Sequence, residues 1–146
     1  MDEIDWEIMK QLQEDGRMSM TRLGKEVNLS VPAVKERVQK LEDKQVISGY
    51  RAMIDPKKVG KHVMAFVLME TSRCEAFRNF CIGHESVIEC HRLVGQYSYL
   101  VKVVVESVEV LEQFIDEAMA FGHPSTLINL SSPVPYKPLV EDETNV

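Results

Sequence analysis

The chain has 146 residues, of which 45% are apolar and 27% charged, a balance typical of a globular protein and not of a disordered one. No uncharged stretch approaches the roughly 18 residues that a membrane span needs, and the sequence opens on an acidic helical pattern without a secretory leader. We therefore expect a cytoplasmic protein with no membrane partner. The three cysteines include no C-x-x-C pair, which argues against a disulfide framework and against a cysteine-rich zinc module.

Charge is distributed in three blocks along the chain. The formal net charge of −6 by itself argues against a nucleic-acid partner, because phosphate binding needs a basic surface. Residues 1–15 carry a net charge of −5, residues 16–61 a net +6 and residues 62–146 a net −7. A basic block between two acidic ones indicates a modular protein with one surface that faces an anion.

Three helices are predicted in the first part of the chain. Apolar residues recur at every fourth position from Ile4, and Gly16 follows where a C-terminal cap belongs. Ser19 and Ser30 can accept hydrogen bonds from the free N–H groups of a second and a third helix, of which the third runs to about Lys44.

A short turn joins the second predicted helix to the third. Asn28 tolerates the positive φ that such a turn requires, and Gly24 before it lets another helix backbone come close. The apolar positions on both sides of the turn predict one shared core: Leu23, Val27, Leu29, Val34, Val38 and Leu41. Two helices joined in this way have the geometry in which the second enters the major groove of DNA.

The outer side of the third predicted helix carries the side chains that would meet DNA. Its cations Lys35, Arg37 and Lys40 are predicted to neutralise phosphates, and the free N–H groups at the start of the helix form another predicted phosphate-binding position. Gln39 and Glu36 have side chains suited to adenine and cytosine edges, respectively. The complete predicted DNA surface comprises Thr21, Arg22, Lys25, Ser30, Pro32, Ala33, Lys35, Glu36, Arg37, Gln39 and Lys40. An amphipathic helix whose charged face is merely solvated remains the alternative.

From Val46 the pattern becomes β-rich, and Asp55-Pro56 marks a turn at which we place the boundary between a domain of residues 1–54 and a domain of residues 55–146. The second domain is predicted to contain strand 62–71, helix 74–83, strand 87–94, a turn at Gly95-Gln96, strand 98–106, helix 108–121 and strand 125–131. The fold class is therefore α+β: an N-terminal three-helix helix-turn-helix domain, winged-helix-like, followed by a C-terminal βαββαβ ferredoxin-like sandwich.

Two of these strands are apolar on both alternating faces, from Val63 to Met69 and from Tyr99 to Val105. The helices of the sandwich cover one face. We expect the same face of a second subunit to cover the other, which predicts a homodimer. A single solvated face with scattered apolar residues is the alternative.

Patterns typical of an enzyme are missing from the sequence. It contains no nucleophile elbow, no glycine-rich nucleotide loop and no close carboxylate pair in an apolar run. Cys81 and His84 lie at helical spacing and Cys90-His91 follow on a strand, but successive strand residues point to opposite faces and do not converge on one metal. We therefore predict no catalytic residue, no metal site and no cofactor.

Several runs of residues together resemble one family, the Lrp/AsnC family of leucine-responsive-type regulators. They are Ile4–Ile8, Leu23–Ser30, Val34–Glu42 and Val46–Tyr50, and the resemblance extends over nearly the whole chain. It implies a bacterial or archaeal transcription factor that is cytoplasmic and nucleoid-associated and binds double-stranded DNA through residues 21–40. It also implies a C-terminal sandwich that forms dimers, which often assemble into octamers.

In that family, effector amino acids bind near a Gly-x-(Tyr/Phe)-Asp-Tyr-like turn between the two central strands. The matching positions, which the resemblance assigns to an effector, are Gly95, Gln96, Tyr97, Ser98 and Tyr99, with Thr126 near the closing side of the pocket. Ser98 stands in place of the usual acidic residue and cannot pair by charge with an ammonium group. A plain β-turn with interface tyrosines is the alternative. Two functions stay open: an effector-gated regulator of amino-acid-related metabolism, and an effector-free, nucleoid-type architectural DNA-binding protein.

Overall fold

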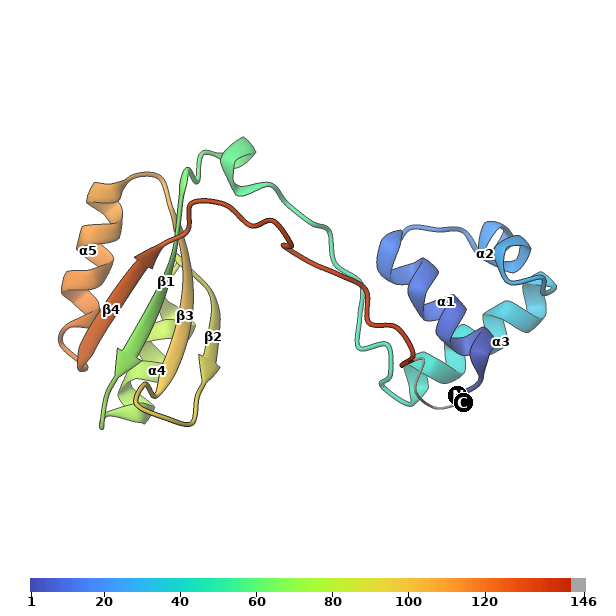
Figure 1. Ribbon diagram of the computed structural model, residues 1–146, viewed down its shortest axis with the longest axis horizontal. Coiled ribbons are helices and arrows are strands. Elements are labelled where there is room, and N and C mark those ends of the chain that lie inside the picture. Colours follow the sequence, from blue (N-terminus) through green and yellow to red (C-terminus); the bar gives the residue numbers. More distant parts are fainter. Residues whose placement is uncertain (143–146) are drawn as a thin grey trace. The chain divides into compact units, whose positions relative to one another are not determined.

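The computed structural model of the protein describes residues 1–142 and forms two compact units (Figure 1). We call Met1–Met53 together with residues 134–142 the helical unit, and Ile54–Pro133 the sheet unit. The chain therefore passes between the units twice. The sequence assigned everything from residue 55 onward to the second domain, whereas residues 134–142 group with the helices, because a side chain of the first helix binds their backbone. Residues 143–146 of that predicted domain lie outside the described part.

The helical unit contains α1 (Glu3–Glu14), α2 (Met20–Glu26) and α3 (Val31–Asp43). A polar side chain caps the start of each helix: the Ser19 hydroxyl accepts from Arg22 N at 3.1 Å and the Ser30 hydroxyl from Ala33 N at 3.4 Å, as predicted. The apolar stripes meet in one core, formed by Ile8, Met9, Leu12, Met18, Leu23, Val27, Val34, Val38 and Leu41. Within residues 1–142 no helix combines the length and the apolar character needed to cross a membrane.

The turn between α2 and α3 depends on two residues that the sequence had singled out. Asn28 has a φ of 56°, in the left-handed region, as predicted. Leu29 N donates to Gly24 O at 2.8 Å, and a Cβ on Gly24 would lie only 2.7 Å from Leu29 O. The backbone that approaches Gly24 is therefore that of the turn itself, and not that of another helix as expected.

Two other local predictions for this unit differ from the structure. Gly16 follows the C-cap residue Asp15, as the pattern predicted for the end of α1, but it does not adopt the left-handed conformation of a glycine cap; Asp15 N donates to Gln11 O at 2.9 Å. Residues 46–54 form no strand, so the described helical unit has no wing. These residues have side chains that favour β-structure, but their backbone has no neighbouring strand to pair with, and Met53 is 84% exposed.

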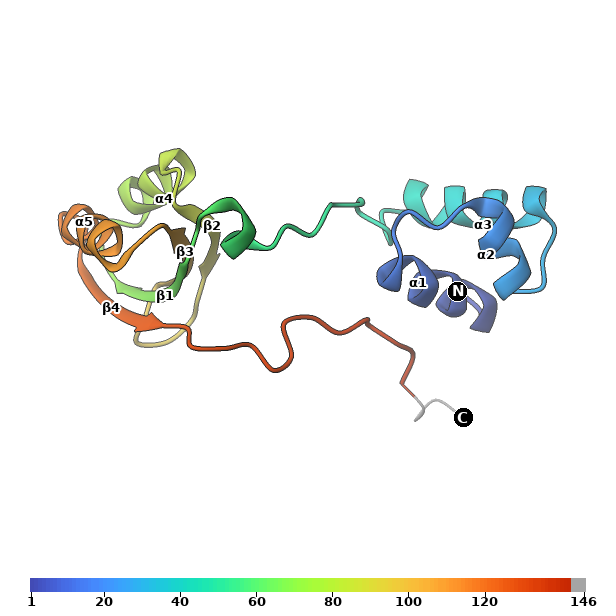
Figure 2. The same cartoon turned by 90° about the horizontal axis from the view of Figure 1, so that it is seen from above.

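The sheet unit begins with a 3₁₀ turn, Pro56–Val59, and continues with β1 (Val63–Glu70), α4 (Cys74–Gly83), β2 (Val87–Arg92), β3 (Tyr99–Val105), α5 (Val108–Ala118) and β4 (His123–Ile128). The strands form one sheet in the order β2-β3-β1-β4 with every neighbouring pair antiparallel. The predicted βαββαβ order and the ferredoxin-like sandwich are thus confirmed. Figure 2 shows α4 and α5 on the same side of the sheet.

The two faces of this sheet have different environments. The face beneath α4 and α5 carries fully buried side chains from alternate positions of the central strands: Ala65, Val67, Met69, Tyr99, Val101, Val103 and Val105. The intervening residues point to the opposite face, which neither helix of the sheet unit covers. We call the apolar centre of this face the open sheet face, defined by Met64, Phe66, Leu68, Leu100, Lys102, Val104 and Leu127, whose positions follow from strand alternation and register. Register places Glu89 and His91 of β2 and Ser125 of β4 beside it on the same side of the sheet.

Candidate nucleic-acid interface

The predicted DNA residues lie together on the outside of α2 and α3. Most are exposed, whereas Ala33 and Arg37 are half-buried. The helical unit is not basic overall, because Met1–Met53 contains nine basic and ten acidic residues. Its cationic surface is local and depends on which cations are already engaged by neighbouring carboxylates.

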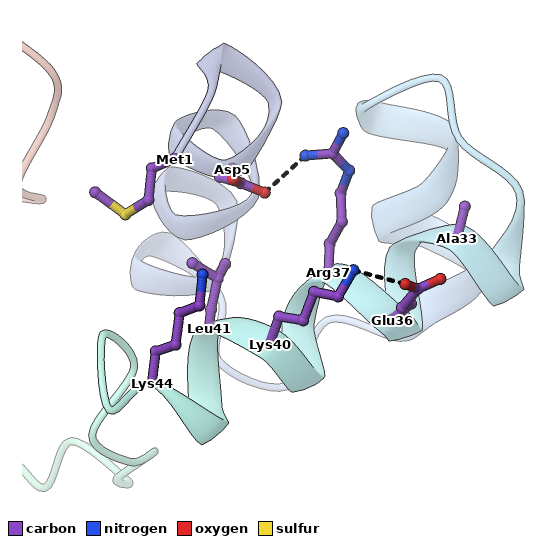
Figure 3. A pocket seen from close by; sticks show the side chains of 8 residues that line it. All are labelled: Met1, Asp5, Ala33, Glu36, Arg37, Lys40, Leu41 and Lys44. Carbon is purple, nitrogen blue, oxygen red and sulfur yellow. Dashed lines mark hydrogen bonds and ion pairs between the residues drawn. The ribbon is translucent and has the colours of Figure 1, made fainter.

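Arg37 differs from the other cations of α3, because its guanidinium binds two carboxylates, one on α1 and one on the residue before it. Its Nη1 lies 2.8 Å from Asp2 Oδ1 and 2.8 Å from Asp5 Oδ1, and its side chain is 30% exposed. Figure 3 shows Arg37 pointing back toward Asp5. The same carboxylates cap α1, since Asp5 N donates to Asp2 Oδ1 and Asp2 N to Asp5 Oδ2.

This network shifts the pKa values of Asp2 and Arg37. The pKa of Asp2 lies below its ordinary value, first because the backbone N–H of Asp5 donates to it and second because Arg37 does. Hydrogen bonds to Asp5 and Asp2 likewise raise the pKa of Arg37. Arg37 thus fastens α3 to the start of α1, a role that the spacing of charges along the sequence did not reveal.

The remaining polar residues of this surface have weaker partners. Lys40 Nζ lies 2.7 Å from Glu36 Oε1, which lowers the pKa of Glu36, and Gln39 Nε2 donates to Asp43 Oδ1 at 2.8 Å. Exposed i,i+4 pairs of this kind contribute little and are screened by salt, so a phosphate or base edge can replace them. Lys25 and Lys35 take part in no ion pair within residues 1–142 and remain free cations.

A pocket of about 390 Å³ lies between the start of α1 and the outer side of α3 (Figure 3). Arg37, Lys40 and Lys44 all line it, so the cationic side of α3 continues to its C-terminal end. Lys44 was not among the predicted DNA-binding residues, although its position four residues after Lys40 places both on one helical face.

The predicted effector turn, Gly95 to Tyr99, joins β2 to β3 beside the end of β1. Ser98 is fully engaged there: its N–H donates to Met69 O at 2.8 Å and its hydroxyl to Thr71 O at 3.0 Å. Tyr99 is buried under α4, and its hydroxyl accepts from Arg78 Nη1 at 3.3 Å. Gln96 is exposed and Tyr97 half-buried, so of the turn's side chains these two remain accessible.

Thr126 does not join this turn. It pairs with Val67 inside the sheet, and its side chain lies on the helix-covered face. The turn contacts Thr71, whose hydroxyl donates to Phe121 O at 2.5 Å. The guanidinium of Arg73 lies 5.3 Å from the ring centroid of Phe121. Thr71 and Arg73 belong to no sequence pattern from which their position beside this turn could have been predicted.

Cys81 on α4 and Cys90 on β2 lie close together, whereas His84 and His91 lie beside carboxylates. Within residues 1–142 no group of three metal-ligating side chains comes together. Cys81 is buried, which raises the pKa of its thiol to about 12, whereas Cys90 is exposed. His84 Nε2 lies 3.1 Å from Glu117 Oε2 and His91 Nε2 3.1 Å from Glu89 Oε2, so each ring has a carboxylate partner.

Comparison with known protein families accounts for both units. Residues 1–42 match the AsnC-type helix-turn-helix domain, and residues 62–139 match the Lrp/AsnC ligand binding domain. The chain belongs to the Lrp/AsnC family. It is therefore a helix-turn-helix transcriptional regulator with a ligand-binding domain, and its curated relatives in the family are regulators, not enzymes.

Individual Lrp/AsnC proteins resemble this chain over most of its length. It is 53% identical to the uncharacterized HTH-type transcriptional regulator YezC of Bacillus subtilis (strain 168), with 90% of this chain and 95% of that protein covered. Identity to the HTH-type transcriptional regulator LrpC of the same strain is 32%, over 90% of this chain and 92% of LrpC. The solved structure of B. subtilis LrpC matches with a TM-score of 0.88 at 31% identity and covers 93% of this chain and 99% of that one.

Proposed function

We propose that this Lrp/AsnC-family protein binds double-stranded DNA with the outer side of α2 and α3, acting as a homodimer. The observation that carries the proposal is the pair of free lysines, Lys25 on α2 and Lys35 on α3, on either side of the Asn28 turn. The N-terminus of α3 at Ser30 adds N–H groups that bind phosphate oxygen. Together they form an anion-binding surface at the end of α3 that enters the major groove in proteins of this architecture.

The other residues of the predicted DNA surface fall into groups according to the side chains that they bind in the absence of DNA. Thr21 and Arg22 join Lys25 in contacting the backbone, and Lys40 does so after leaving Glu36. Gln39 and Glu36 read bases once released from Asp43 and Lys40. Pro32 and Ala33 lie at the first turn of α3, close enough for apolar contact.

The test is binding of the purified protein to the DNA upstream of its own gene, against a scrambled competitor, at several salt concentrations. Replacing Lys25 and Lys35 by Ala together should weaken binding to every sequence and reduce the slope of log affinity against log salt by about one unit per lost phosphate contact. Lys58→Ala, which removes an equal exposed charge from the sheet unit, is the matched control for each single variant. An unchanged slope in the double variant would place the DNA surface elsewhere.

The proposal of a homodimer is based on the open sheet face. Six of its seven residues are apolar, and Leu127 is 54% exposed, although it lies beside Phe66 in the sheet. The same face of a second copy would bury this surface by a two-fold, self-complementary contact. Light scattering measures the resulting mass and also tells a dimer from the octamer that the family resemblance implies.

The ligand of the sheet unit is the second part of the proposal. A regulator of Neisseria meningitidis with the same fold, at 22% identity and a TM-score of 0.89 over 95% of this chain and 96% of that one, was solved as a complex with L-Met. A relative from Escherichia coli (strain K12), 32% identical over 82% of this chain and 76% of that protein, is named leucine-responsive regulatory protein. An amino acid or similar small molecule at the Gly95–Tyr99 turn is therefore the first candidate effector.

The chemistry of Ser98 favours an alternative. Its hydroxyl already donates to Thr71 O and it carries no charge, so an α-ammonium group finds no carboxylate at this position. An effector-free architectural DNA-binding protein is therefore the second candidate. A pool of the twenty amino acids added to the binding experiment separates them, since only an effector-gated regulator changes affinity or assembly. A specific regulator should also prefer its own site by about a thousandfold or more.

A further inference from the structure

One glutamine side chain holds the C-terminal segment against α1. Gln13 Nε2 donates to Leu139 O at 2.9 Å, and Gln13 Oε1 accepts from Leu139 N at 2.8 Å and from the Tyr136 hydroxyl at 3.1 Å. A side-chain amide thus pairs with a backbone peptide group in both directions, as two backbone segments would. We call residues 134–142 the strap.

The strap follows a single stripe of α1. Glu3, Trp6 and Lys10 line a pocket of about 600 Å³ together with the end of the strap, and Gln13 continues the same stripe by one turn. Helical periodicity places this stripe nearly opposite Ile8, Met9 and Leu12, the residues that enter the core. Asp5, which binds Arg37, is also outside the stripe, and no residue of the strap lines the pocket beside the outer side of α3.

The strap belongs to both parts of the protein. Its residues up to Leu139 fall within the Lrp/AsnC ligand binding domain match, which runs from residue 62 to residue 139, yet they pack in the helical unit. The helical unit is therefore joined to the sheet unit by two stretches of chain, one before Ile54 and one after Pro133. A unit held at two points has less orientational freedom than a unit held at one.

The contact between the strap and α1 is weak enough to break reversibly. Leu139 is 77% exposed and Tyr136 52% exposed, so the strap buries little apolar surface, and solvent-exposed hydrogen bonds add only modest stability. Pro135 and Pro138 restrict the free strap and reduce the entropy that it loses on docking. Docked and released states of such a segment lie close in free energy.

We propose that the strap is a detachable second tether by which the ligand-binding domain controls the freedom, and hence the DNA affinity, of the helix-turn-helix. Docking restricts the helical unit before DNA arrives, so less orientational freedom is lost on binding. A ligand that favours one state of the strap would change DNA affinity in the corresponding direction. The DNA part of this inference rests on the proposed function; the docking part does not.

Trp6, the only tryptophan of the chain, reports on docking because it lines the pocket beside the strap. Gln13→Ala in the full-length protein, and a chain ended after Pro133, should both increase acrylamide quenching of Trp6 fluorescence. Gln11→Ala is the matched control: it removes the same type of side chain two residues earlier on α1, where Gln11 Nε2 donates to Glu7 Oε1 at 2.7 Å and, within residues 1–142, does not bind the strap. Equal quenching in all four proteins would overturn the proposal.

The same variants then test the tether. Gln13→Ala and the shortened chain should bind the specific DNA about 3- to 10-fold more weakly than the wild type, while Gln11→Ala should not. Altered Trp6 quenching with unchanged DNA affinity would refute the tether. A wild-type protein without DNA affinity would refute the proposed function, and the Trp6 measurement would still decide whether the strap docks.

Discussion

Two surfaces differ in how their side chains are accommodated in the absence of a partner molecule: the outer surface of α2 and α3, and the open sheet face. On α3, Arg37 and Lys40 have carboxylates of the same chain to bind, and water solvates the rest. On the open sheet face the one charged residue, Lys102, lies 3.6 Å from Glu89 on β2, and the other six residues are apolar. Ion pairs can be exchanged for phosphates at little cost, whereas exposed apolar area needs lasting cover. The first surface therefore suits reversible binding and the second permanent assembly.

The sharpest test of this contrast uses two neighbours on β1 that face opposite ways. Val67 lies in the helix-covered core, so Val67→Lys should destabilise the sheet unit by about 3–5 kcal/mol or prevent folding, because it buries an unpaired charge. Phe66→Lys should keep the fold and separate the subunits. Circular dichroism measures the fold and light scattering the mass. Equal loss of structure in both variants, or a folded dimer with Lys at position 66, would contradict the assignment of the open sheet face.

A second test compares one glycine from each unit. Gly24→Ala should destabilise the helical unit by about 1–3 kcal/mol, because the new Cβ would lie 2.7 Å from Leu29 O and the turn must move. Gly83→Ala, at the end of α4, meets nothing within 4 Å and should be neutral or slightly stabilising. Urea unfolding of both variants measures the difference. A neutral Gly24→Ala would show that the turn can shift without strain.

A third test separates structural from DNA-binding cations on α3. Lys35→Ala should weaken DNA binding and leave thermal stability unchanged, because Lys35 has no carboxylate partner in the described chain. Arg37→Ala should lower the unfolding temperature as well, because it leaves Asp2 and Asp5 without their shared cation. If Arg37→Ala affected only the salt dependence of DNA binding, its main contact would be with phosphate and not with α1.

Local patterns predicted much of this structure. The hydroxyl caps at Ser19 and Ser30 and the turn at Asn28 depend on residues within three or four positions, so the sequence reveals them directly. The βαββαβ order is likewise confirmed, although β4 begins two residues earlier than predicted. Contacts between distant residues could not be predicted: Arg37 meets Asp2 across 35 positions and Leu139 meets Gln13 across 126. The β-rich run after Val46 misled for the same reason, since a strand exists only where another strand is present to pair with it.

The smallest expected effect is the pH dependence of the Asp2 cap. Because the pKa of Asp2 is lowered in the folded protein, its ionised form contributes stability at pH values above the ordinary Asp range. That contribution should be lost as the pH falls below about 3.8 and through the lowered folded pKa. Asp2→Asn keeps a capping side chain but has no charge to lose, so it provides the reference.

Thermal unfolding of the helical unit, followed from pH 7 down to about pH 2.5, should therefore show the wild type a few degrees more stable than Asp2→Asn at neutral pH. The two curves should converge as Asp2 becomes protonated. Arg37→Met should reduce the difference at neutral pH without abolishing it, because the backbone N–H of Asp5 is the larger cause of the shift. A difference that stayed constant with pH would mean that Asp2 stabilises α1 by its shape alone, and that the Arg37 network contributes no charge-dependent stability to the proposed DNA surface.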